Sequence, residues 1–92
     1  MESIHDWILE SVAFDWESAR VTVALRSHKQ QRVLLADGVM DLKVPKVNAW
    51  GPSSSVNGTS EAIVDAKGSR HLKLEMQTGD VIEIVAREFT LT

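Results

Sequence analysis

The fold is decided by residues 69–86, which read SRHLKLEMQTGDVIEIVA. In the first half, Leu72, Leu74 and Met76 alternate with polar residues, the period of two that is typical of a strand with one buried and one solvated face. A second apolar run, residues 81–86, follows after a short polar break. The stretch therefore predicts a β-hairpin.

The loop between these two strands sets their register. Gly79 permits a three-residue loop, residues 77–79, in which a type I turn is closed by a residue at positive φ and a G1 bulge. The opposed pairs are then Leu74 with Ile82, Leu72 with Ile84, and Lys73 with Glu83. Apolar and opposite-charge pairs of this kind each contribute about 0.2–1 kcal/mol. A two-residue loop would oppose Leu74 and Glu83, so we favour the three-residue loop.

Strand patterns continue on the N-terminal side of the hairpin. Residues 20–26 alternate, with Val21, Val23 and Leu25 on the inward face. Less regular strands are expected at residues 8–14 (Ile8, Val12 and Phe14 inward), 32–36, 39–44 and 61–66, the last of these as either a short edge strand or a helical turn. Asp37-Gly38 is expected to form a hairpin turn or a bulge, and Phe89 and Leu91 to extend the last strand.

This reading predicts an all-β fold, a mostly antiparallel sandwich or flattened barrel of six or seven strands. A chain of 92 residues is the size of one domain, so residues 1–92 are expected to form a single β domain. The chain has no cysteine, which excludes disulfides and thiolate metal sites. It has neither an apolar run of about 20 residues nor a basic start typical of a signal peptide. We therefore expect a cytoplasmic protein with no membrane contact.

The charge pattern does not indicate a nucleic-acid-binding protein. Thirteen acidic residues against ten basic ones give a net charge of −3, with the two signs interspersed. The densest basic cluster is Arg26, His28, Lys29 and Arg32, flanked by glutamines. Such a cluster is more typical of a solvated turn than of a phosphate-binding face.

The best candidate for a functional surface lies in the long loop between Pro45 and Ser69. Its candidate binding residues are Asn48, Trp50, Gly51, Pro52, Ser53 and Asn57. Trp50 offers a large apolar area with one N–H donor, and the Gly-Pro pair limits the loop entropy lost on binding. The alternative is that Trp50 closes one end of the β core. The two interpretations are compatible if one edge of the indole ring stays exposed.

Catalytic and metal-binding groupings are not evident. His5 and Asp6 suggest an oriented imidazole, but adjacent residues of a strand point to opposite faces, so a terminal cap is the favoured interpretation. No histidine pair has zinc-motif spacing, no serine lies in a nucleophile elbow, and no glycine-rich phosphate loop is present. We therefore expect no catalytic residues, no metal and no cofactor.

The chain also resembles a known family through several short motifs. These are His5-Asp6-Trp7, Asp15-Trp16-Glu17, Asn48-Ala49-Trp50-Gly51-Pro52-Ser53 followed by Ser55-Val56-Asn57, and residues 75–84, EMQTGDVIEI. Together they are similar to a family of short, uncharacterised bacterial proteins and, more distantly, to the small β-rich immunity domains of bacterial toxin systems. The resemblance covers most of the chain and implies no catalytic residues.

Three hypotheses on function follow. The first is a non-enzymatic protein-binding module that uses the Trp50 loop or an open sheet edge to bind a protein partner or a second copy in a homodimer. The second is a small-molecule-binding protein or enzyme with a cleft under the Trp50 loop, where His5, Asp15 or His71 would meet the indole. The third is a toxin-neutralising protein with an acidic patch.

Overall fold

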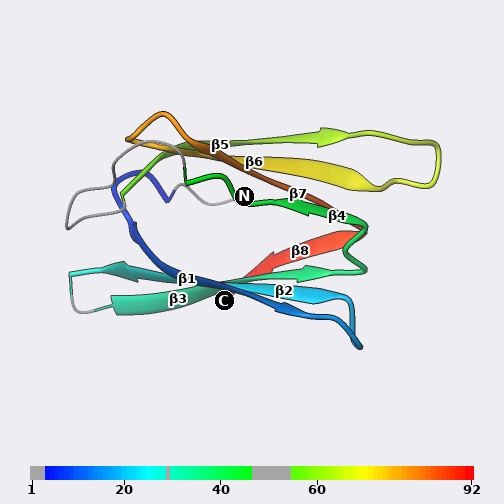
Figure 1. Ribbon diagram of the computed structural model, residues 1–92, viewed down its shortest axis with the longest axis horizontal. Coiled ribbons are helices and arrows are strands. Elements are labelled where there is room, and N and C mark those ends of the chain that lie inside the picture. The colour runs from blue at the N-terminus through cyan, green and yellow to red at the C-terminus, as the bar shows by residue number, and fades with distance from the viewer. Residues whose placement is uncertain (1–3, 29, 47–54) are drawn as a thin grey trace.

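The computed structural model describes residues 4–28, 30–46 and 55–92, which form two four-stranded antiparallel sheets packed face to face (Figure 1). The eight strands are β1 (Ile8–Asp15), β2 (Arg20–Ser27), β3 (Gln30–Asp37), β4 (Asp41–Lys43), β5 (Val56–Ile63), β6 (Arg70–Met76), β7 (Val81–Ala86) and β8 (Glu88–Leu91). One sheet has the order β1-β2-β3-β8, and the other β4-β7-β6-β5. The predicted all-β sandwich is confirmed, with eight strands rather than six or seven. Arg26 and His28, of the basic cluster that was expected to form a solvated turn, lie where β2 turns into β3.

The hairpin of β6 and β7 has the predicted register. Leu74 lies opposite Ile82, and Lys73 lies opposite Glu83. Gly79 has a φ of 96°, and its N–H donates to the carbonyl of Met76 at 2.9 Å. The three-residue loop is therefore confirmed, because only a residue that tolerates positive φ closes it without strain.

The core lies between the inner faces of the two sheets. Alternation brings every second residue of β2, β6 and β7 into it, as the sequence predicted. The fully buried side chains are Ile4, Val21, Val23, Leu25, Leu34, Val56, Leu72, Leu74, Met76, Ile82 and Ile84. At roughly 1.5–3 kcal/mol for each buried side chain of this size, this set is the main stabilising term of the fold.

Strand β1 differs from the prediction in which residues face inward. The register with β2 shifts between Leu9 and Ser11, so Glu10 is the extra residue of a β-bulge. Before the bulge Leu9 is buried, whereas after it Val12 packs on the core. The expected inward position of Ile8 was therefore wrong, because one inserted residue reverses the alternation.

Two connections, β3–β4 and β7–β8, carry the chain from one sheet to the other at the same corner. Asp37-Gly38 was expected to form a hairpin turn or a bulge, but it carries the chain from β3 in one sheet to β4 in the other. Next to it, the chain leaves β7 at Arg87 and enters β8, which pairs with β3. The N–H of Arg87 donates to the carbonyl of Asp37 at 3.0 Å, so the two crossings are hydrogen-bonded to each other. Phe89 and Leu91 thus belong to a separate strand and do not extend β7.

The region between Pro45 and Ser69 has more strand than expected. Strand β5 pairs with β6 and begins at Val56, within the stretch that was predicted to be a loop. Conversely, β4 has only three residues, where a strand over residues 39–44 was expected. Figure 1 shows the β5–β6 hairpin projecting beyond the end of the other sheet.

Candidate functional site

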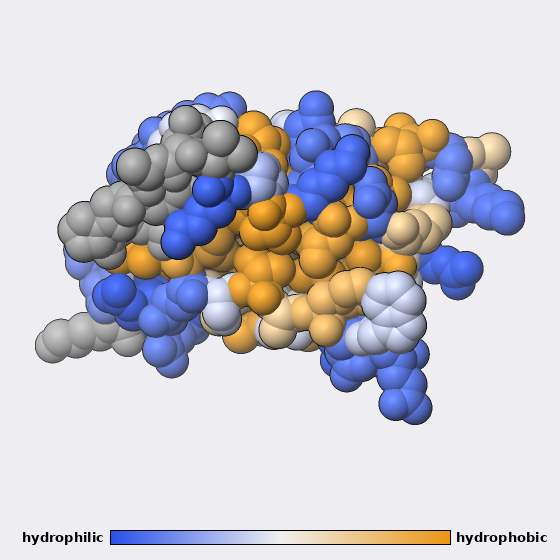
Figure 2. Space-filling model, viewed as in Figure 1, coloured by the Kyte–Doolittle hydropathy of each residue, from blue (hydrophilic) through white to orange (hydrophobic). Residues whose placement is uncertain are grey.

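A groove lies between the β1–β2 turn and β4. It has a volume of about 530 Å³. We call it the edge groove, and its lining residues are Phe14, Trp16, Ala19, Val39, Met40, Asp41 and Leu42. It opens between the two sheets beside outer strands β1 and β4. Figure 2 shows that apolar side chains reach the surface in a band between the two layers.

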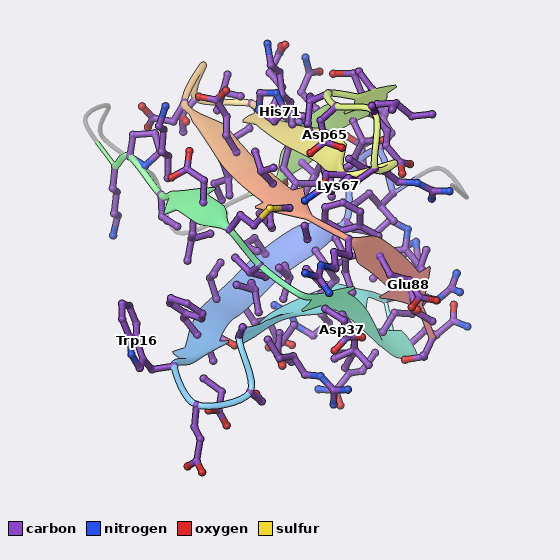
Figure 3. The ribbon with its side chains drawn as sticks, turned by 90° about the vertical axis from the view of Figure 1, so that its right-hand side faces the viewer. Trp16, Asp37, Asp65, Lys67, His71 and Glu88 are labelled. Atoms are coloured by element: carbon purple, nitrogen blue, oxygen red, sulfur yellow. The ribbon has the colours of Figure 1, made fainter. Side chains whose placement is uncertain are left out.

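Two aromatic side chains form one wall of the edge groove. Trp16 is 85% exposed, and Phe14, 42% exposed, packs against it with ring centroids 5.6 Å apart. Figure 3 shows Trp16 standing out from the β1–β2 turn, on the opposite sheet from Asp65 and Lys67. An exposed pair of large aromatic side chains on a rigid turn is typical of a contact surface.

The backbone of the β1–β2 turn holds this wall in place. The carboxylate of Asp15 accepts hydrogen bonds from the N–H groups of Glu17 and Ser18 at 3.1 and 3.2 Å. Ala19 has a φ of 54°, and its carbonyl accepts from the N–H of Val39 at 2.9 Å. The turn is therefore bonded to the β3–β4 crossing that supplies the opposite wall.

Met40 forms the second wall of the groove with its neighbours on β4. It is 53% exposed, and its sulfur lies 4.0 Å from the hydroxyl oxygen of Ser69. The thioether is flexible and polarisable, so it can adapt to side chains of different shape. Leu42 below it is partly buried against the core, which gives the groove an apolar floor.

Three carboxylates lie at or beside the edge groove, and we call them its acidic rim. Asp15 and Glu17 are exposed at the turn, and Asp41 lines the groove. Asp41 is 3.9 Å from the ammonium of Lys43, and this ion pair is exposed on both sides. The groove is thus an apolar surface with an acidic rim.

The opposite end of the sandwich is closed by residues 4–8, which we call the N-terminal clamp. The N–H of Asp6 donates to the carbonyl of Val56, and the N–H of Val56 donates to the carbonyl of Trp7, both at 2.8 Å. The amide of Gln77 donates to the carboxylate of Asp6 at 2.7 Å. Ile4 is fully buried, so this segment contributes to the core as well as bridging the sheets.

His5 and Asp6 come closer than the sequence indicated. Nε2 of His5 lies 3.6 Å from the carboxylate of Asp6, and Nδ1 lies 3.1 Å from the carbonyl of Asn57. The expectation that they point to opposite faces was wrong, because Asp6 has a φ of 67° and forms a turn before β1 begins. Both side chains are more than half exposed and serve the clamp, in keeping with the predicted terminal cap.

Of the six candidate binding residues of the Trp50 loop, the structure describes only Asn57. Asn48, Trp50, Gly51, Pro52 and Ser53 lie outside the described residues. Asn57 lies on β5, and its amide donates to the carboxylate of Glu75 at 2.7 Å. Asn57 is therefore placed at the clamped end and is not among the residues that line the edge groove.

His5, Asp15 and His71, which were expected to meet Trp50 in a cleft, each contact a different part of the structure. His71 lies on the outer face of β6 with Nε2 3.0 Å from the carboxylate of Glu83, while Asp15 is bound to its own turn and His5 to the clamp. Among the residues that the structure describes, no group of three or more histidine, aspartate and glutamate side chains could hold a metal ion. In the same part of the chain, no helix has the length and apolar character to cross a membrane.

The carboxyl group of Asp65, at the tip of the β5–β6 hairpin, has a shifted pKa. The hydrogen bonds from Ser69, and then those from the backbone of Lys67 and Gly68, lower the pKa of Asp65 below its ordinary value. The N–H groups of Lys67 and Ser69 donate to its carboxylate at 2.9 and 3.1 Å. These bonds stabilise the ionised form and fix the turn.

The sequence reasoning did not identify Phe14, Trp16 or Met40 as site residues. One signal was available, because a tryptophan between two acidic residues in a tight turn has little chance of reaching the core. The opposing wall was not predictable, since it depends on the crossing of Gly38 to the other sheet. In comparisons with known proteins, no family model matches the chain and no curated protein matches it.

Proposed function

We propose that this protein is a non-enzymatic binding module that holds an extended segment of another protein in the edge groove. The single observation that carries this proposal is the exposed aromatic pair, Trp16 on Phe14, facing Met40 across the groove. Isolated exposed apolar residues are common on protein surfaces, but large ones that line a shared groove mark contact sites. The groove is open, which suits a peptide segment better than an enclosed small molecule.

The position of the groove favours an extended segment over a helix. The groove runs beside β4, an outer strand that pairs with β7 on one side only among the described residues. A peptide that lies along such a strand gains main-chain hydrogen bonds from it and places alternate side chains in the groove. Strand β4 is short, so the backbone supplies few bonds and the apolar contacts to Trp16 and Met40 supply most of the affinity.

The acidic rim indicates the charge of the partner. Asp15, Glu17 and Asp41 favour a segment that carries lysine or arginine next to its apolar residues. Association with such a segment is faster at low salt because the opposite charges steer the encounter. Toxin neutralisation is a more specific form of the same proposal, since it also requires an acidic surface that faces a basic partner.

A crosslinking experiment tests the proposal directly. A photoreactive amino acid replaces Trp16 in one variant and Ile63, an exposed apolar residue outside the groove, in a matched control. We expect the Trp16 variant alone to crosslink, in host cells, to a peptide that mass spectrometry identifies as an extended, basic and apolar segment.

Three results would contradict the proposal. They are crosslinks only to the protein's own chain, an acidic peptide, or the same peptide from both positions. As a further check, Trp16→Ala should lose capture of the identified segment while the thermal unfolding curve stays unchanged, because the side chain is almost fully exposed.

A further inference from the structure

The four outer strands of the sandwich differ in how they are protected from pairing with other chains. Strand β4 has three residues and precedes Pro45, β8 has four residues, and β1 carries the bulge at Glu10. Short length, proline, charge and bulges are the usual devices that block an outer strand. Strand β5 has eight residues, its only ionisable side chain is Glu61, it has no proline, and its bulge lies near its start, at Asn57. From Gly58 to Ile63 it is regular, which makes this the longest stretch of outer strand with neither bulge nor proline among the described residues.

The backbone groups of β5 that point away from β6 can be identified from the ladder. The N–H of Val64 donates to the carbonyl of Ser69 at 2.9 Å, which makes these two residues a hydrogen-bonded pair. Such pairs alternate in an antiparallel ladder, so the backbone groups of Ala62 and Ser60 also face β6. Those of Thr59, Glu61 and Ile63 therefore point to the outer side.

This outer side is accessible over the second half of β5. The N-terminal clamp pairs with the same side only near Ser55, Val56 and Asn57. Farther along, the hairpin projects beyond the other sheet (Figure 1), and every residue from Thr59 to Ile63 is exposed. The one charge is already compensated, since Arg70 lies 3.1 Å from the carboxylate of Glu61.

We infer that the outer side of β5 pairs with β5 of a second copy, antiparallel about a two-fold axis at Ser60, and joins two sheets into one. In this register Thr59 of each copy lies opposite Glu61 of the other, and their outward N–H and C=O groups form the hydrogen-bonded pairs. A register centred on Glu61 would oppose two carboxylates, which is unfavourable. Self-pairing suits this strand because the same groups serve both copies, as an isologous interface requires.

Ile63 supplies the apolar part of this interface. It is 71% exposed, which is unusual for isoleucine. In the Ser60-centred register the last regular pair is Ala62 with Gly58, and Ile63 lies just beyond it, next to the bulge at Asn57 of the second copy, where that copy's clamp reaches β5. The dimer therefore covers two isoleucines at the ends of a short ladder, a small interface typical of weak, concentration-dependent association.

Cysteine crosslinking tests both the pairing and its register, because the natural chain contains no cysteine. In the inferred register the Cα atoms of the two Ser60 residues are about 4.5 Å apart, within the range that a disulfide spans. Ala62→Cys is the matched control, since the same register separates its two copies by four residues along the ladder. We expect Ser60→Cys to give at least about tenfold more disulfide dimer than Ala62→Cys under mild oxidation.

A second variant tests the interface without crosslinking. Thr59→Pro removes one outward N–H, which an outer strand tolerates, and should convert the concentration-dependent dimer to a monomer in sedimentation velocity. Trp16→Ala should leave the dimer intact, so failure of this inference is distinguishable from failure of the proposed function. Equal or greater crosslinking through Ala62→Cys would overturn the register, and a wild-type protein that stays monomeric at millimolar concentration would overturn the pairing.

Discussion

The two ends of the sandwich use their aromatic and polar residues in opposite ways. At the clamped end, Ile4 is fully buried and Trp7 packs on the core beneath the guanidinium of Arg32, 5.9 Å from its ring. At the open end, Trp16 and Phe14 lie at the β1–β2 turn, and both side chains are exposed. The chain thus places comparable apolar residues where they stabilise the fold at one end and where they are available for binding at the other.

The difference arises from how each end of β1 is held. Its start is hydrogen-bonded through the clamp to β5, which belongs to the other sheet. Its end leads into the β1–β2 turn, where the carbonyl of Ala19 accepts from the N–H of Val39 in the β3–β4 crossing. A single strand therefore closes the gap between the sheets at one end and leaves it open at the other.

The largest effect should come from removing a buried side chain at the clamped end. Ile4→Ala leaves a cavity between the sheets and should lower the free energy of unfolding by about 2–4 kcal/mol, or the Tm by roughly 10–20 °C. Trp16→Ala at the open end should change it by less than about 0.5 kcal/mol. Differential scanning calorimetry measures both. Similar losses for the two variants would remove the distinction between the ends.

The next effect concerns the crossing that carries the wall of the edge groove. Gly38 has a φ of 66°, and a Cβ there would lie 2.9 Å from the Cγ and Cδ of Arg87. Gly38→Ala should therefore destabilise the protein by about 1–2 kcal/mol or more in urea denaturation. Gly58→Ala is the matched control, because a Cβ at Gly58 meets no atom within 4 Å. A neutral Gly38→Ala would mean that the crossing is not rigid.

A smaller effect is expected for one polar contact of the clamp. Gln77→Ala removes the 2.7 Å hydrogen bond to Asp6 and should reduce stability by about 0.5–1 kcal/mol, since both groups are exposed. It should also increase amide hydrogen exchange at Asp6 while leaving Val39 unchanged. Faster exchange at both positions would show that the two ends are coupled.

The smallest effect is a local dependence on pH. The pKa of Asp65 is lowered in the folded protein because its ionised carboxylate accepts hydrogen bonds from Ser69 and Lys67. These bonds therefore stabilise the folded protein fully above the ordinary carboxyl pKa, and this stabilisation is lost as the pH falls through the lowered pKa. Amide exchange of Lys67 and Ser69, corrected for its intrinsic pH dependence, should therefore increase on acidification. Asp65→Asn should remove this dependence. An unchanged pH profile in that variant would assign the effect to another group.

The sequence determines the part of the fold that local rules control. The register of Leu74 with Ile82 follows from a loop of fixed length and strict alternation, and both are readable from neighbouring residues. The crossing at Gly38 was not predictable, because positive φ suits a hairpin, a bulge or a change of sheet equally well. The first part of β5, residues 56–60, was missed because its Asn, Gly, Thr and Ser residues are a composition typical of loops, whereas residues 61–63 fall within the expected short edge strand.

The candidate site was less predictable than the fold. An open sheet edge was one of the surfaces expected from sequence, but the candidate residues were placed around Trp50, which a Gly-Pro pair follows. The exposure of Trp16 depends on Val39 and Met40, which reach the β1–β2 turn only through a long-range crossing. Such contacts between distant segments leave no periodic pattern in the sequence.

The pairing of β8 with β3 has a consequence for synthesis of the protein. Leu34 lies opposite Leu91, so β3 emerges from the ribosome long before its partner strand does. During that interval, at roughly 5–20 residues per second, a nascent sheet of β1, β2 and β3 presents an open strand for about three to ten seconds. Chaperone capture during translation should therefore concentrate on β3 and end when β8 emerges.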